Sequence, residues 1–143
     1  MQIGVETTKA VDQRRVFVVD DDEITRAALQ FMLHDEIETH ELPDMASAYA
    51  KGTDWLLPDL LIVGIGIIKS EGLGVLADIA ARYPQARVLI ATGKEDEALA
   101  LQALRGGAHG ALIKPLRIEA VRSKVDTILG RAGGMALVQL GGL

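Results

Sequence analysis

The chain has no cysteine among its 143 residues, so disulfides and thiolate chemistry are excluded. Aromatic residues make up only 3% of it, which argues against platforms on which nucleic-acid bases stack. The net charge of -5 is also unlike the basic surface of a general nucleic-acid binder. Mild acidity is typical of soluble proteins, and we expect this domain not to bind nucleic acid.

Long apolar runs are also missing from the sequence. The longest, Leu60–Ile68, is far shorter than the roughly 20 residues that a membrane helix needs. The N-terminal segment mixes charged residues such as Glu6, Lys9 and Arg14 and has no apolar core, so it does not predict a signal peptide. We therefore expect a cytoplasmic protein that does not enter a membrane.

Five short apolar runs recur at fairly regular intervals along the chain. In three of them Val, Ile and Leu stand side by side without polar alternation, which is typical of parallel strands covered on both faces. The predicted strands are Val16–Val19, Ile37–Leu42, Leu60–Val63, Val88–Ala91 and Ala111–Ile113.

Segments with helical patterning lie between and after these runs. Asp22 and Asp44 stand where a helix N-cap is expected, and Gly52, Gly106 and Gly130 stand where helices are expected to end. The predicted helices cover residues 23–33, 45–52, 73–83, 95–107 and 116–130.

A strand followed by a helix, repeated five times, predicts an α/β fold with a doubly wound parallel sheet. We expect this domain to cover residues 15–130. Residues 1–14 are predicted to be a flexible N-terminal tail. Residues 131–143 are rich in glycine but also carry apolar side chains, and are predicted to be a linker or a C-terminal extension.

Polar side chains follow several of the predicted strands, at the edge where ligands bind in open α/β sheets. The first strand is followed by Asp20, Asp21 and Asp22, the fourth ends near Thr92, and the fifth is followed by Lys114. Mg²⁺ takes one or two carboxylates together with waters and carbonyls, so Asp20 and Asp21 are candidate metal ligands. The alternative is that Lys114 neutralises one of these acids, which then act as solvated caps.

Three segments together carry a family resemblance: VFVVDDDEITR, PDLLIVGIGIIKSEGLGVL and RVLIATGKEDEALALQALRGGAHGALIKPL. In this order and spacing they resemble the receiver domains of bacterial two-component response regulators, which act in phosphorelay signal transduction. The resemblance covers about residues 15–130. It implies a flavodoxin-like (βα)5 fold with strand order 2-1-3-4-5 and a signalling role rather than an enzymatic one.

The resemblance also implies roles for the residues at the edge of the sheet. In the family an acid pair binds Mg²⁺, and Asp20 and Asp21 match it. An Asp at the end of strand three accepts a phosphoryl group from a histidine kinase. A Thr or Ser on strand four and a Lys before a Pro contact the phosphoryl oxygens, roles that fall to Thr92 and Lys114. The Lys-Pro bond is usually cis in the family.

Gly64 stands where the family has its phospho-accepting Asp. Glycine has no nucleophile, so aspartyl phosphate cannot form at this position, and one Mg²⁺ ligand is lost with it. We therefore expect no cofactor, and at most weak or vestigial Mg²⁺ binding. The loop predicted after Gly64 is unusually apolar, and Ala111 stands where the family often has an aromatic residue. These departures predict a degenerate receiver that acts by phosphorylation-independent protein–protein interaction.

A partner surface is predicted on the fourth helix, where residues 98–104 are apolar at nearly every position. Receivers often pass signals through helix four, strand five and helix five. We expect a protein partner, an output domain or a homodimer contact there, at Leu99, Leu101, Leu104 and Ala111.

Two other interpretations of the acidic edge stay open. The first is a receiver that takes its phosphoryl group on Asp21 or Asp22 with the help of Mg²⁺. The second is a small flavodoxin-like enzyme or nucleotide binder at the same edge, although the adjacent acids repel phosphates that carry no metal.

Overall fold

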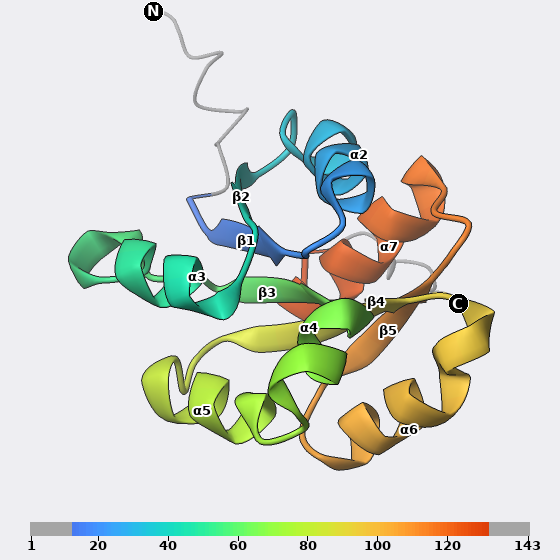
Figure 1. Ribbon diagram of the computed structural model, residues 1–143. Coiled ribbons are helices and arrows are strands. Elements are labelled where there is room, and N and C mark those ends of the chain that lie inside the picture. The colour runs from blue at the N-terminus through green and yellow to red at the C-terminus, as the bar shows by residue number, and fades with distance from the viewer. Residues whose placement is uncertain (1–12, 132–143) are drawn as a thin grey trace, which may run out of the picture.

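Five parallel strands form one sheet in the computed structural model, which describes residues 13–131 (Figure 1). The strand order β2-β1-β3-β4-β5 confirms the predicted flavodoxin-like fold. The strands are β1 (Arg15–Val19), β2 (Glu38–Leu42), β3 (Leu60–Gly64), β4 (Arg87–Thr92) and β5 (Gly110–Ile113).

Helices cover both faces of this sheet (Figure 1). On one face lie α2 (Glu23–Leu33) and α7 (Ile118–Leu129). The other face carries α3 (Met45–Lys51), α4 (Ile65–Glu71), α5 (Val75–Arg82) and α6 (Glu97–Arg105). Two short 3₁₀ turns, η1 (Asp54–Leu56) and η2 (Lys94–Asp96), precede β3 and α6.

The two predicted N-caps both form. Asp22 accepts a hydrogen bond of 3.2 Å from the backbone N–H of Ile24, and Asp44 accepts one of 2.8 Å from that of Ser47. Each bond satisfies a backbone donor that has no partner within its helix, which is why these helices begin where the aspartates stand. A predicted C-cap also forms. Gly130 ends α7 with a left-handed φ of 79°, the conformation that favours glycine at this position.

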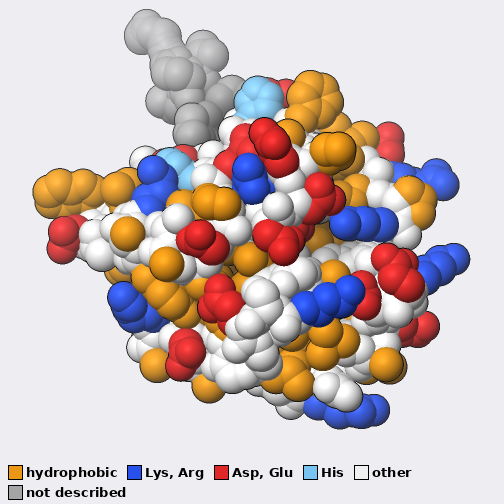
Figure 2. Space-filling model, viewed as in Figure 1, with side chains coloured by type: hydrophobic (Ala, Val, Ile, Leu, Met, Phe, Trp, Pro, Cys, Tyr) orange, Lys and Arg blue, Asp and Glu red, His pale blue; other side chains and the backbone are white. Residues whose placement is uncertain are grey.

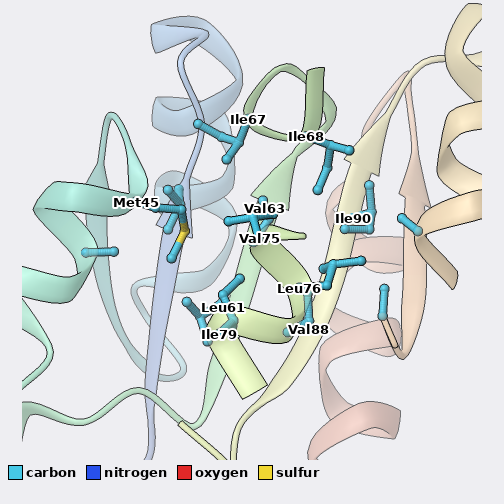
Figure 3. Close-up of a cluster of buried hydrophobic side chains, with 14 of the residues drawn as sticks. Met45, Leu61, Val63, Ile67, Ile68, Val75, Leu76, Ile79, Val88 and Ile90 are labelled. Atoms are coloured by element: carbon cyan, nitrogen blue, oxygen red, sulfur yellow. The ribbon is translucent and has the colours of Figure 1, made fainter. Parts of the chain in front are cut away.

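Alternate residues of the central strands supply two separate cores. Val16 and Val18 of β1 face α2 and α7, whereas Phe17 and Val19 face the opposite layer, and all four are fully buried. Burial on both faces explains why polar residues do not alternate with apolar ones in these strands. Figure 3 shows part of the second core, where side chains of β3 and β4 meet those of α5.

Helix α4 was not predicted, because residues 65–68 were interpreted as a loop. The loop prediction is wrong, since β3 passes directly into α4 with Gly64 as the last strand residue and the N-cap. Ile65, Ile67 and Ile68 are all buried, and Figure 3 shows Ile67 and Ile68 above the sheet on the side of Val63 and Ile90. The apolar character of this segment is therefore explained by its packing on the sheet.

The other predicted helices differ from the structure only at their ends. The helix predicted from residue 73 begins at Val75, and the segment predicted from residue 95 starts with η2 before α6. Residues 1–12 and 132–143 lie outside the described residues, so the predicted tail and extension stay predictions. Between residues 13 and 131, no helix is both long and apolar enough to cross a membrane.

Candidate functional site at the carboxyl edge of the sheet

Four neighbouring strands bring the predicted site residues to one edge. Asp20 follows β1, Gly64 ends β3, Thr92 ends β4 and Lys114 follows β5. The register places Gly64 opposite Ala91, one residue before Thr92. The predicted site residues therefore do lie at one edge of the sheet. What this edge can do chemically depends on how their side chains are arranged.

The side chain of Asp20 lies against the α-carbon of Gly64. Asp20 is only 3% exposed, and a Cβ placed on Gly64 would overlap its carboxylate. The backbone of Gly64, with φ of -68° and ψ of 147°, is one that any residue can adopt. Any side chain at position 64 would therefore require the Asp20 carboxylate to shift, and backbone strain plays no part in this.

Hydrogen bonds hold both the carboxylate and the backbone carbonyl group of Asp20. The N–H of Asp22 donates to its Oδ1 at 2.9 Å, and the Arg26 guanidinium donates to the Asp20 carbonyl oxygen at 2.7 Å. Burial raises the pKa of the Asp20 carboxyl above its ordinary value of 3.8, while the Asp22 hydrogen bond and the charge of Lys114 oppose that rise. Asp20 is thus a buried acid whose negative charge is only partly compensated.

Replacing Asp20 by asparagine is expected to stabilise the protein at neutral pH by about 1 kcal/mol. The asparagine oxygen keeps an acceptor for the Asp22 N–H but carries no charge. Because the folded-state pKa of Asp20 is raised, its contribution to stability is full below about pH 3.8 and is lost as the pH rises through the folded pKa. Chemical denaturation of both proteins between acidic and neutral pH measures this difference. A stability difference that grows toward acid pH contradicts the assignment.

Gly66 lies against the Asp21 carboxylate in the same way as Gly64 lies against that of Asp20. A Cβ on Gly66 would overlap the Asp21 carboxylate, which lies over the first turn of α4. Asp21 differs from Asp20 in being exposed, so its side chain is free to turn away. The two glycines around Ile65 thus leave room for two carboxylates from the end of β1.

Asp22 binds its own helix and Lys114. The Thr25 hydroxyl donates to the Asp22 carboxylate at 2.6 Å, and this bond is the main cause of a lowered pKa of Asp22. Lys114 Nζ lies 3.9 Å from Asp22 Oδ2. Lys114 is predicted from the sequence to pair with Asp20 or Asp21, whereas the ion pair in the described part of the chain forms with Asp22. The Asp20 carboxylate is turned toward Gly64, although the charge of Lys114 still acts to lower its pKa.

Thr92 and Lys114 complete the edge. Thr92 is fully buried, and its hydroxyl donates locally to the Gly93 carbonyl oxygen at 2.9 Å, as expected for a structural role. The bond between Lys114 and Pro115 is cis, which is the isomer that the family resemblance implies. These two side chains are therefore used in contacts within the domain.

Two contacts near the edge were missed in the sequence. Lys69 Nζ of α4 lies 2.9 Å from Asp96 Oδ1 of η2, so an ion pair joins the segments that follow β3 and β4. Arg26, besides its bond to Asp20, lies 3.6 Å from Glu41 of β2. Lys69 was missed because α4 was interpreted as a loop. Figure 2 shows acidic and basic side chains interspersed on the face in view, in line with such pairing.

These residues do not fit the Mg²⁺ site that the family resemblance implies. Position 64 supplies no carboxylate, and the carboxylate of Asp20 fills the space beside it. Within residues 13–131, no three His, Cys, Asp or Glu side chains are grouped so that they could hold a metal ion. The acids that remain at this edge are Asp20, which is buried against Gly64, and the exposed Asp21 and Asp22, of which Asp22 caps α2.

The predicted partner surface is only partly exposed. Leu99 and Leu104 of α6 are partly buried and pack against the core, whereas Leu101 is 45% exposed. Ala111 of β5 is half-buried, and Ile113, at 48% exposed, was not among the predicted contact residues. The exposed apolar area here therefore centres on Leu101 and Ile113.

Comparison with known proteins finds similarity over most of the described residues. A family model for the response regulator receiver domain matches residues 16–126. The transcriptional regulatory protein PhoP of Escherichia coli O157:H7 is 28% identical over 126 residues, which cover 85% of this chain and 55% of PhoP. The virulence transcriptional regulatory protein PhoP of Salmonella typhimurium strain 14028s is 29% identical over a stretch of the same length. The chain thus spans about half the length of these curated relatives.

Solved structures give a matching result. The receiver domain of NtrX from Brucella abortus is 29% identical, with a TM-score of 0.73 over 80% of this chain and 98% of that domain. A longer crystal structure of NtrX from the same organism is 26% identical and has a TM-score of 0.76, and the match covers 90% of this chain and 30% of that one. The similarity therefore includes the fold and the order of the elements that form the edge.

Proposed function

Because the chain belongs to the response regulator receiver domains, we propose that it is an atypical receiver that signals without forming aspartyl phosphate at the usual position. The observation that carries the proposal is the pairing of Gly64 with the buried Asp20 side chain. Position 64 has no nucleophile, and the space in which a nucleophile would stand is already filled.

The rest of the edge supports this proposal. In receivers the metal neutralises the charge of the incoming phosphoryl group, and here the metal site lacks a carboxylate. The Thr92 hydroxyl is bonded to the adjacent carbonyl oxygen, and Lys114 is beside Asp22. Ala111 offers no aromatic ring that could follow a change at Thr92. The acid, Thr and Lys residues are thus accounted for by roles within the folded domain.

Signalling then depends on contacts with proteins. We propose a surface formed by α6, β5 and α7, with Leu101 and Ile113 as its exposed apolar residues and Leu99, Leu104 and Ala111 beneath or beside them. The partner is a separate protein, a second copy or an output domain. The PhoP relatives are transcriptional regulators, which supports an output domain that this chain controls. The domain itself acts in the cytoplasm, without catalysis and without binding nucleic acid.

A second candidate function is phosphorylation of another carboxylate. The exposure of Asp21 and the distance of 3.9 Å between Lys114 and Asp22 favour it. Against Asp22, its carboxylate already caps α2 and accepts the Thr25 hydroxyl. Acetyl phosphate with Mg²⁺ separates the two functions. The main proposal expects no incorporated phosphate in the parent protein, whereas the alternative expects incorporation that disappears in Asp21→Asn or in Asp22→Asn.

A further inference from the structure

The only tryptophan of the chain lies on the surface. Trp55, in η1, is 83% exposed, more than any other large apolar side chain in the described part of the chain. Aromatic side chains contribute strongly to packing when they are buried, and tryptophan is enriched at the centres of protein interfaces. Trp55 also lies outside the residues proposed above as a partner surface.

The backbone turns just before the exposed Trp55. Asp54, just before it, has a φ of 56°, the only positive φ of a non-glycine residue in the described chain. The turn is closed by a hydrogen bond of 2.9 Å from the Leu56 N–H to the Thr53 carbonyl oxygen. Aspartate adopts this left-handed conformation more readily than most non-glycine residues, and it turns the chain immediately before Trp55. In Figure 1 the chain that follows α3 forms the tip of the molecule at the left.

An apolar cavity begins two residues after Trp55. Its volume is about 300 Å³, and it is lined mainly by Leu57, Pro58, Tyr83, Pro84 and Ala86. Trp55 is not among the lining residues, so its own side chain does not fill the cavity. An engineered apolar cavity of about 150 Å³ accommodates benzene, which indicates that this one has room for an indole ring.

We infer that Trp55 inserts into this cavity on a second copy of the chain. Leu57 and Pro58 of the cavity lining follow Trp55 closely in the chain, and a two-fold axis between two copies then lets both tryptophans insert reciprocally. The half-exposed Leu57 is the link between them, because it lines the cavity and stands two residues from Trp55.

The charges around Trp55 and the cavity are compatible with a dimer of this kind. Lys51 and Asp54 are near Trp55 in the sequence, and Arg82 and Asp59 line the cavity, so each of the two parts brings one charge of each sign. Asp59 accepts a backbone hydrogen bond of 2.8 Å from Arg15, and Arg82 lies over the Tyr49 ring at 4.4 Å. The balance of charge lets two identical surfaces meet without the repulsion expected of a patch of one sign.

The surface area that Trp55 and the cavity can bury predicts a weak dimer. A tryptophan buries roughly 150–250 Å² of surface. Two tryptophans and the residues around them are expected to bury less than about 1,200 Å² in total. Interfaces of that size are typical of transient complexes. We therefore expect association in the range of tens to hundreds of micromolar, roughly, and not at nanomolar concentrations.

Sedimentation velocity of the full chain, from about 10 μM to about 1 mM, tests this dimer. Because Trp55 is the only tryptophan, acrylamide quenching of its fluorescence in the same samples reports directly on its burial. The average mass is expected to rise with concentration while quenching falls. Trp55→Ala and Leu57→Ser are each expected to weaken association at least about tenfold.

Phe31→Ala is the matched control. Phe31 is 70% exposed on α2, which covers the opposite face of the sheet, so its removal is expected to leave association unchanged. All three substituted side chains are exposed, and thermal unfolding checks that each variant folds. A chain that stays monomeric to about 1 mM overturns the inference. So does a dimer that survives Trp55→Ala or is lost in Phe31→Ala.

Discussion

Replacing Ile67 by alanine is expected to lower the free energy of unfolding by about 2–5 kcal/mol. Ile67 is 2% exposed and belongs to the core between the sheet and the layer of α3 to α6. Truncation removes apolar contacts and leaves a cavity that the surroundings fill only in part. Ile68, equally buried in the same cluster, is expected to behave in the same way. Urea or guanidinium denaturation of the full chain measures both losses.

Ile24→Ala is the matched control for these variants. Ile24 also lies in a helix but is 80% exposed, so its truncation is expected to change stability by no more than about 0.5 kcal/mol. If Ile67→Ala and Ile68→Ala were as mild as this control, the segment after β3 would be a mobile loop. The helical packing of α4 and the explanation given for its isoleucines would then be wrong.

A double-mutant cycle at Gly64 and Asp20 is expected to show a coupling energy of about 1–3 kcal/mol. Gly64→Ala alone should destabilise the protein, because the added methyl group overlaps the Asp20 carboxylate. In an Asp20→Ala background that carboxylate is absent, so Gly64→Ala should cost little. The backbone at Gly64 suits alanine, which leaves steric overlap as the cause of any loss. Denaturation of the four proteins supplies the cycle.

Gly66→Ala separates crowding from a general sensitivity of this segment. Its added methyl group meets Asp21, whose exposed side chain can turn away, and alanine favours the helix. We expect Gly66→Ala to be neutral or stabilising by a few tenths of a kcal/mol to about 1 kcal/mol. Additive effects at Gly64 and Asp20, within about 0.5 kcal/mol, would contradict the direct contact between them.

The contact between Gly64 and Asp20 also affects any attempt to restore an aspartate at position 64. Placing an aspartate at position 64 requires Asp20 to leave the space that it occupies. A single Gly64→Asp substitution therefore does not recreate the acidic arrangement of the family unless the Asp20 side chain shifts with it. The glycine and the buried acid form one unit in this domain.

Much of the fold was predictable because its signals are local. The apolar runs of the strands, the aspartates at two N-caps and the glycine after α7 each specify a local conformation, and the alternation of elements leaves few topologies. Helix α4 was missed since IGIIKSE is too short to show a helical period and follows a strand without a break. Its conformation depends on packing against Val63 and Ile90, which local patterns do not reveal.

The site was predictable in place but not in detail. The ends of parallel strands meet at one edge, so Asp20, Thr92 and Lys114 were bound to be near one another. The direction of each side chain was not readable from the sequence. Asp20 turns into the space left by Gly64, and Lys114 lies beside Asp22. The spacing of Gly64 and Gly66 was the available sign, because two glycines so close together leave room for side chains from elsewhere.

Intact mass spectrometry after incubation with acetyl phosphate and Mg²⁺ tests the central claim most directly. A receiver that has the acidic residue at the end of strand three serves as the positive control in parallel samples. This chain is expected to keep its unmodified mass throughout the time course in which the control gains one phosphoryl group. A near-stoichiometric gain of one phosphoryl group by this chain, reversed by hydroxylamine, would contradict the claim that it works without aspartyl phosphate.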